Sequence, residues 1–326
     1  MKKQTKVIVA ILLFAVIFGG LLATATFTDL NVSHILTKNT LANHEYYTNE
    51  TVYGVVLEAV GSSPVYLMLA FSFQILFWQA MRKMKLHPAK ELVAIALLVA
   101  STIAYYVMFD DAVKYTFQHV HAEDFRKELF LKGISLFFGA LMTFFATLAI
   151  RNYSEKSVSK LVMFAVAVIA VAALSNGIVA LVKVPMGRMR YRAMNTEGGA
   201  SIGGFDNFTR WYVPNGQMDK EEMKRLFGTT DACKSFPSGH TCSAGMVYCL
   251  LMLLDVFAVK SKGKKAVCWI AAVAYTGMVA VSRIIVGAHF FSDVLMGGTI
   301  AFVSMIICRE IFICKGSNVE ALFGKE

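Results

Sequence analysis

The chain alternates between long apolar segments and short polar ones, and this pattern predicts helices that cross a membrane. Several uninterrupted apolar runs approach the roughly 20 residues that an α-helix needs to cross the hydrocarbon core of a bilayer. The shorter runs are also compatible with tilted, buried or re-entrant helices, so six to eight spans are expected. The eight segments are residues 7–27, 62–81, 91–109, 133–150, 160–182, 240–259, 266–282 and 294–314.

The composition supports the same fold class. Of the 326 residues, 56% are hydrophobic and only 17% are charged, and the mean hydropathy is +0.56. A soluble globular protein of this length would carry charge on about a quarter of its residues. We therefore expect an all-α, polytopic bundle of transmembrane helices.

The net charge of +10 comes mostly from basic loops between the predicted spans, and it does not indicate a nucleic-acid-binding site. Short loops rich in lysine and arginine alternate along the chain with loops that lack this excess, as the positive-inside rule expects. Residues 28–61 hold one lysine and four carboxylates. We therefore expect both termini in the cytoplasm and no nucleic-acid partner. The basic residues of the cytoplasmic loops are Lys2, Lys3, Lys6, Arg82, Lys83, Lys85, Lys90, Arg151, Lys156, Lys160, Lys260, Lys262, Lys264 and Lys265.

The first segment has two interpretations. Lys2 and Lys3 precede an apolar run that ends near Ala23-Thr24-Ala25, as in a signal peptide with its cleavage site. The run is long for a signal peptide, so we favour an uncleaved anchor. Residue 28 lies outside the cytoplasm in both cases, and we expect a bacterial cell membrane.

The six cysteines form neither a metal-binding pattern nor a disulfide framework. Five of them fall in or beside apolar segments, where cysteine acts as a small hydrophobic residue. Cys233 stands alone in an outer loop. We therefore expect no metal and no cofactor.

Polar and charged residues that are suited to binding or catalysis gather at the ends of the last four segments. The topology inferred from the lysines places these ends on one face of the membrane, outside the cytoplasm. The topology is inferred from the basic loops alone, so the common face of these clusters is an independent observation. In chain order the clusters are Lys183 with Arg190, then Ser238-Gly239-His240, then Arg283 with His289 and Asp293.

These clusters suit a phosphoryl-transfer site that needs no metal. Lysine and arginine hold phosphate oxygens, and Ser238 and Gly239 precede a helix start, whose free N–H groups favour an anion. The spacing of His289 and Asp293 predicts that they share a helix face, where the carboxylate can fix the tautomer of a nucleophilic imidazole. His240 is then placed to protonate the leaving oxygen.

Each of these residues also has an ordinary explanation when taken alone. Lys183 can anchor the end of a span at the interface, and Pro-Ser-Gly can be a turn and helix cap. Asp293 can complement a helix dipole. Their joint occurrence on one face favours catalysis, because Pro-Ser-Gly-His alone is expected by chance in about one in a thousand chains of this length.

The three clusters together resemble the signature of the type 2 phosphatidic acid phosphatase superfamily, which includes membrane lipid phosphatases and is related to vanadium haloperoxidases. The resemblance covers about residues 91–314 and implies a six-helix phosphatase core. About two extra spans and an outer cap at 28–61 would then fill residues 1–90, and 315–326 would be a cytoplasmic tail.

The resemblance also implies a role for each site residue. His289 would be the nucleophile that forms a phosphohistidine, Asp293 would orient it, and His240 would be the general acid. The residues that would bind phosphate are Lys183, Arg190, Ser238, Gly239 and Arg283.

One position departs from the usual pattern, in which the first motif ends in Arg-Pro. Here Arg190 is followed by Tyr191. Proline stiffens the loop and does not contact phosphate, so the change concerns the shape of the loop. Arg188 and Arg192 lie close in sequence and are the alternatives to Arg190 as the phosphate-binding arginine.

Three functions follow from this sequence. The favoured one is an integral-membrane phosphatase that hydrolyses a lipid phosphate or a polyprenyl diphosphate at the outer face of the membrane. A lipid phosphotransferase of the same superfamily would pass the phosphoryl group to an acceptor other than water. A transporter would suit eight spans and could use Asn176 as a polar pathway residue, but charged residues are scarce inside the spans.

Overall fold

The computed structural model describes residues 3–37, 51–85, 87–119 and 129–323. Within them, eight helices or helix pairs are long and apolar enough to cross a membrane, which confirms the all-α, multi-pass fold and all eight expected segments. They are α1 (Lys3–Thr37), α2 with α3 (Val52–Val60 and Ser63–Lys83), α4 (His87–His119), α6 (Leu129–Arg151), α7 (Glu155–Met186), α11 with η2 and α12 (Gly239–Ala244, Gly245–Met252 and Leu253–Val256), α13 (Lys262–Ile285) and α14 (Phe291–Phe312).

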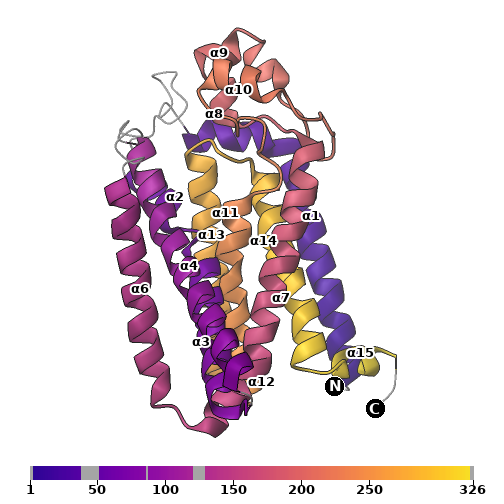
Figure 1. The fold of residues 1–326 in the computed structure, drawn as a ribbon. Coiled ribbons are helices and arrows are strands. Elements are labelled where there is room, and N and C mark those ends of the chain that lie inside the picture. Colours follow the sequence, from indigo (N-terminus) through magenta and orange to yellow (C-terminus); the bar gives the residue numbers. More distant parts are fainter. Residues whose placement is uncertain (1–2, 38–50, 86, 120–128, 324–326) are drawn as a thin grey trace.

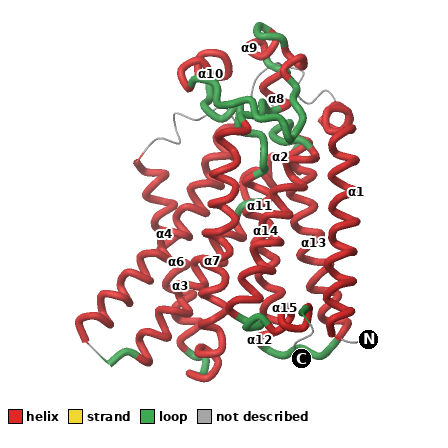
Figure 2. Tube along the Cα trace, turned by 90° about the vertical axis from the view of Figure 1, so that its right-hand side faces the viewer, coloured by secondary structure: helices red, strands yellow, loops and turns green. Residues whose placement is uncertain are grey.

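The spanning helices stand side by side, and short helices cover one end of the bundle (Figures 1 and 2). Both termini lie at the opposite end, where Lys3 of α1 donates a hydrogen bond to the carbonyl of Ser317. We call the covered end the capped end of the bundle. The short helices are α8 (Tyr191–Met194), α9 (Glu197–Ala200), η1 (Gly204–Asn207) and α10 (Lys220–Phe227) at the capped end, and α15 (Ser317–Leu322) near the termini.

Helix α1 is longer than a membrane span requires. Its 35 residues correspond to about 52 Å of helix at 1.5 Å per residue. Its last turns lie across the capped end in Figure 1, where Asp29 and His34 contact Arg188 and Tyr191. Residues 28–37, which the sequence placed in an outer cap, thus continue the helix, and residues 38–50 of that predicted cap lie outside the described residues.

The sixth span is only 18 residues long and contains a stretch of 3₁₀-helix, η2. A 3₁₀-helix rises about 2.0 Å per residue, whereas an α-helix rises about 1.5 Å. Eight 3₁₀ residues therefore extend the span to about 31 Å, which matches the roughly 30 Å hydrocarbon core of a bilayer. A purely α-helical segment of the same length would fall a few ångströms short.

A continuous apolar core joins α3, α7, η2 and α14 in the middle of the bundle. Its fully buried members include Val168 and Val171 of α7, Met246 of η2 and Met305 of α14. Helix α7 packs against α3, α11 and α14, and α13 packs against α11. This packing brings the ends of α7, α11, α13 and α14 together at the capped end.

The short helices at the capped end have a small apolar core of their own. Met194, Met223, Phe227 and Phe290 are buried there. The chain enters this segment at Gly187, which ends α7 in the left-handed conformation with φ of 49°. A Cβ atom at this glycine would lie 1.4 Å from a backbone oxygen of the cap, so only glycine fits.

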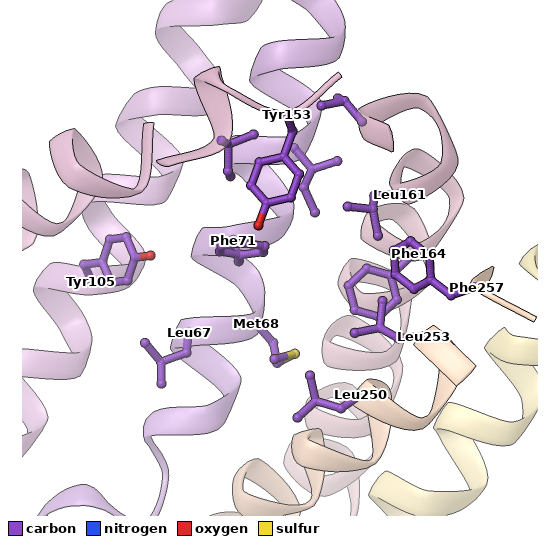
Figure 3. Close-up of a pocket in the computed structure, with 13 residues that line it drawn as sticks. Leu67, Met68, Phe71, Tyr105, Tyr153, Leu161, Phe164, Leu250, Leu253 and Phe257 are labelled. Atoms are coloured by element: carbon purple, nitrogen blue, oxygen red, sulfur yellow. The ribbon is translucent and has the colours of Figure 1, made fainter. Parts of the chain in front are cut away.

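An apolar cavity of about 400 Å³ opens between α3, α7 and η2 (Figure 3). Leu67, Met68, Phe71, Leu161 and Phe164 line it, together with other apolar or tyrosine side chains. Tyr153 and Phe257 place its far end near α12, away from the capped end. Since no charged group lines this cavity, it is not a site for phosphate.

Gly297 allows α14 to pass close to the start of α11. A Cβ atom at this position would lie 2.3 Å from the carbonyl oxygen of Ser238, whereas a Cβ atom at Gly277 on the exposed face of α13 would meet nothing within 4 Å. We predict that Gly297→Ala lowers the free energy of unfolding by roughly 1–3 kcal/mol through overpacking. The matched variant Gly277→Ala should leave it unchanged. Thermal unfolding in detergent checks this, and an unchanged Tm for Gly297→Ala would contradict the packing.

Candidate active site

The structure brings all the predicted site residues together at the capped end of the bundle. The approach of α7, α13 and α14 to α11 places the three sequence clusters side by side. One direct link is the backbone N–H of Ser238, which donates to the carbonyl of Asp293 at 3.0 Å. The positions are the last turn of α7 for Lys183, the N-cap of α8 for Arg190, the start of α11 for Ser238, Gly239 and His240, the last turn of α13 for Arg283, the connection before α14 for His289 and the first turn of α14 for Asp293.

His289 is almost fully buried in the connection between α13 and α14. Its Nδ1 lies 2.6 Å from the backbone carbonyl oxygen of Ser235 and 3.9 Å from Oδ2 of Asp293. Because a carbonyl only accepts, Nδ1 carries the proton, and Nε2 keeps the lone pair that a nucleophile needs. The prediction that His289 and Asp293 share a helix face is wrong, since α14 begins at Phe291. The two residues are close, but the direct partner of the ring is Ser235.

The carboxylate of Asp293 fixes the two chain segments that hold His289. Its Oδ1 accepts from Arg188 at 2.6 Å. Its Oδ2 accepts from the hydroxyl of Ser235 at 2.5 Å and from the backbone N–H of Phe290 at 2.8 Å. Any effect of Asp293 on the imidazole orientation therefore passes mainly through Ser235, whose carbonyl holds Nδ1.

Arg188 is fully buried, and all three nitrogens of its guanidinium group have partners. Besides its bond to Asp293, Nη1 donates to the hydroxyl of Ser292 at 2.9 Å, and Nη2 donates to Asp29 at 2.9 Å. Nε donates to the carbonyl of Thr209 at 2.8 Å. Four of its five N–H groups are thus bound within the protein, which favours Arg190 over Arg188 as the phosphate ligand.

Arg283 has N–H groups that no described residue accepts. Its Nη1 lies 3.0 Å from Oε1 of Glu58, while Nε and Nη2 are buried without a hydrogen-bond partner among the described residues. Arg192 lies 3.5 Å from the same oxygen of Glu58. Glu58 therefore holds two guanidinium groups, and Arg283 still has N–H groups to offer a ligand.

The remaining predicted phosphate ligands surround the start of α11. The hydroxyl of Ser238 accepts the N–H of Thr241 at 3.3 Å and so caps the helix. The Nζ atom of Lys183 lies 3.6 Å from the place that a Cβ atom would take at Gly239. Arg190 forms an ion pair with Asp231 at 3.0 Å. A Cβ atom at Gly239 would be in ordinary van der Waals contact with this lysine, so Lys183 lies beside the start of α11.

His240 lies on the first turn of α11 and meets α4. Its ring packs edge-on against Tyr115, with 5.0 Å between ring centroids. Its Nε2 is buried and has no hydrogen-bond partner among the described residues. A ligand or substrate oxygen would supply that partner.

The electrostatics of the site favour a neutral imidazole and an anionic ligand. The pKa of His289 is lowered to about 3, mainly by burial; the charges of Arg190 and Lys183 also lower it, and Asp293 raises it. Among the described residues at the site, five cations outnumber four carboxylates: Lys183, Arg188, Arg190, Arg192 and Arg283 against Asp29, Glu58, Asp231 and Asp293. This leaves an excess of positive charge for a phosphate to neutralise.

Tyr191, the departure from the usual proline, occupies the first position of α8. Proline suits this position because its fixed φ matches a helix start. Tyr191 instead anchors the loop through its side chain, which packs against Phe205 and Phe290 and lies 2.7 Å from the ring nitrogen Nδ1 of His34. The loop keeps its place by aromatic packing.

Sequence reasoning missed Asp29, Glu58 and Ser235. Asp29 and Glu58 were noted only as negative charges of an outer segment, although each is buried and bonded to a site arginine. A carboxylate near the end of an apolar segment is a signal for a buried ion pair, but it does not name the partner. Ser235 acts through its hydroxyl, which binds Asp293, and through its backbone carbonyl, which holds His289 and which any residue would supply.

The fold and this cluster define a multi-pass membrane protein with a buried site of two imidazoles and several cations. Residues 161–313 match the model of the PAP2 superfamily, and this segment contains all the predicted site residues. This match supports the resemblance to the type 2 phosphatidic acid phosphatase superfamily, whose members are generally phosphatases. No curated protein and no solved structure matches the chain.

The low pKa of His289 predicts a pH-dependent stability. Between pH 3 and 6.5 the unfolded chain binds a proton at this residue and the folded chain does not, so stability falls as the pH drops through this window. The loss attributable to His289 is at most about 1.4 kcal/mol per pH unit. In thermal unfolding between pH 6.5 and 4.5, the wild type should therefore lose more stability than His289→Gln. Equal losses would contradict the assignment, and slopes between pH 7 and 8 serve as the control.

Proposed function

We propose that this chain is an integral-membrane phosphatase that hydrolyses a lipid phosphate or diphosphate through a phosphohistidine, without a metal. The observation that carries the proposal is that Nε and Nη2 of Arg283 are buried without a hydrogen-bond partner among the described residues, in the same site as a histidine whose Nδ1 is held by a carbonyl. Buried N–H groups without partners are costly, and an anion that accepts from them removes that cost. The ligand that fits such a cationic site is a phosphate.

The proposed reaction has two steps. Nε2 of His289 attacks phosphorus, the bond from phosphorus to the lipid oxygen breaks, and protonated His240 gives its proton to that oxygen. Water then attacks the phosphohistidine, His240 takes one of its protons, and inorganic phosphate leaves as the P–N bond breaks. Arg283, Lys183 and Arg190 would stabilise the charge on the phosphoryl oxygens in both steps.

A lipid substrate suits the surroundings of the site. The spanning helices expose large apolar side chains along their length, such as Leu136 and Phe137 of α6 and Ile270 of α13. The site lies at the end of these helices, where a phosphate headgroup meets water while its acyl or prenyl tail stays in the bilayer. We place this end outside the cytoplasm, because basic loops mark the other end.

Asn176, the residue that suggested a transporter, has a hydrogen-bond partner within its own helix. Asn176 donates to the carbonyl of Ala172 in its own helix at 2.9 Å. Hydrogen bonding to the preceding turn is a common way to satisfy a polar side chain inside a membrane helix. Asn176 therefore needs no role in a transport pathway.

The first test is phosphate release by purified protein from phosphatidate, phosphatidylglycerophosphate and polyprenyl diphosphate, with a chelator present. We expect release from at least one of them, and we expect His289→Ala to lower it by about a thousandfold or more, because the nucleophile is lost. Normal turnover by His289→Ala would overturn the role of the nucleophile, and full loss with chelator would overturn the metal-free mechanism. Label that moves to a second lipid and not to water would identify a phosphotransferase.

The second test separates the two histidines by the leaving group. p-Nitrophenolate is a good leaving group that needs no protonation, whereas a lipid alkoxide must be protonated as it leaves. We predict that His240→Ala loses much less activity in the first step with p-nitrophenyl phosphate than with a lipid phosphate. Its slow second step should produce a burst of one p-nitrophenol per enzyme in stopped-flow absorbance. Equal losses on both substrates without a burst would contradict the role of His240.

A further inference from the structure

The first two helices of the chain supply buried carboxylates to the candidate site. Asp29 of α1 is 3% exposed and Glu58 of α2 is 1% exposed. Both lie outside residues 161–313, the segment that matches the PAP2 superfamily. Each is bonded to an arginine of that segment: Asp29 to Arg188, and Glu58 to Arg283 and Arg192.

We propose that Asp29 and Glu58 are positioning residues of the active site, so that the N-terminal helices complete a site whose reacting groups all lie in residues 161–313. The kinetic part of this inference rests on the proposed phosphatase function. The two carboxylates act on different parts of the site: Asp29 on the nucleophile and Glu58 on the phosphate-binding arginines.

Asp29 reaches His289 through an unbroken chain of contacts. Its Oδ1 accepts the backbone N–H of Ser292 at 2.8 Å, and its Oδ2 accepts the hydroxyl of Ser292 at 2.5 Å and Nη2 of Arg188 at 2.9 Å. Arg188 in turn donates to Asp293, which binds Ser235. The carbonyl of Ser235 then holds Nδ1 of the imidazole.

This chain of contacts predicts which kinetic constant Asp29 controls. In Asp29→Asn, Arg188 keeps only one carboxylate partner, and an amide NH2 group replaces the oxygen that accepts from Arg188 and from the hydroxyl of Ser292. The nucleophile would then be misaligned while the phosphate ligands stay in place. A misplacement of about 1 Å costs up to about 100-fold in rate, so kcat should fall while the affinity for a phosphate analogue changes little.

Glu58 acts on Arg283 and Arg192 directly. One carboxylate oxygen lies 3.0 Å from Arg283 and 3.5 Å from Arg192, so it offsets the repulsion between two buried cations. The same contact directs Nη1 of Arg283 to Glu58 and leaves Nε and Nη2 as the donors without a partner among the described residues. Loss of the charge at position 58 should therefore weaken phosphate binding first.

The experiment compares full-length wild type with Asp29→Asn, Glu58→Gln and Glu58→Asp, using orthovanadate as the phosphate analogue. Asp255→Asn is the matched control, because Asp255 forms its ion pair with Arg309 near the uncapped end. The readouts are kcat, KM, the vanadate inhibition constant and the vanadate-induced rise in Tm. We expect Asp29→Asn to lower kcat by about 10- to 100-fold at nearly unchanged vanadate affinity.

We expect Glu58→Gln to raise KM and the vanadate inhibition constant by about tenfold or more. Glu58→Asp keeps the charge and should recover part of that loss, and Asp255→Asn should match the wild type. If Glu58→Gln does not fold, Glu58→Asp still tests the claim by the direction of its smaller change in vanadate affinity. Wild-type constants in folded Asp29→Asn or Glu58→Gln would overturn the proposal, as would the same uniform loss in both.

The two proposals fail in different ways. If the wild type binds vanadate but releases no phosphate, the phosphatase function fails, and the vanadate-induced rise in Tm still tests Glu58 by itself. If the wild type hydrolyses lipid phosphate and both variants behave like it, only the positioning role fails. If the wild type neither hydrolyses nor binds vanadate, both proposals fall.

Discussion

A buried guanidinium group must be paired, and the capped end of this protein is organised around Arg188, which no water reaches. Its partners are Asp29 of α1 and Asp293 of α14, so one cation joins the N-terminal helix, the loop after α7 and the last spanning helix. Removing one partner of a buried ion pair typically costs about 3–5 kcal/mol, because the other charge stays buried. The position of Ser235, and through it of His289, depends on this arrangement.

The site separates its cations by task. Arg188 has every nitrogen bound within the protein and serves the fold, whereas Arg283 keeps N–H groups that the described residues do not engage. The division follows from the number of carboxylates around each group: Arg188 has two, while Arg283 shares one with Arg192. Two arginines of one site can therefore have different functions, decided by partners far away in the chain.

The spans and the grouping of the motifs could be predicted from the sequence, whereas these long-range ion pairs could not. Apolar length and the loop charges were enough to find all eight spans, because the bilayer sets the length of a helix. The motifs also led to the site residues, since each motif stands at the end of a span. Asp29 lies 159 residues from Arg188 and Glu58 lies 134 residues from Arg192 in sequence, distances at which spacing carries no information. The local turn that puts His289 outside α14 was missed because an i, i+4 spacing has the same form in a helix and just before one.

The central claim is that phosphate lies between Nε2 of His289 and the donors of Arg283, with Asp29 and Glu58 holding those groups in place. A structure of the protein with orthovanadate tests it most directly. We predict vanadium bonded to Nε2 of His289, with Nε or Nη2 of Arg283 within hydrogen-bonding distance of its oxygens and Glu58 still on Nη1. Vanadate bonded to His240, or bound away from Arg283, would contradict it.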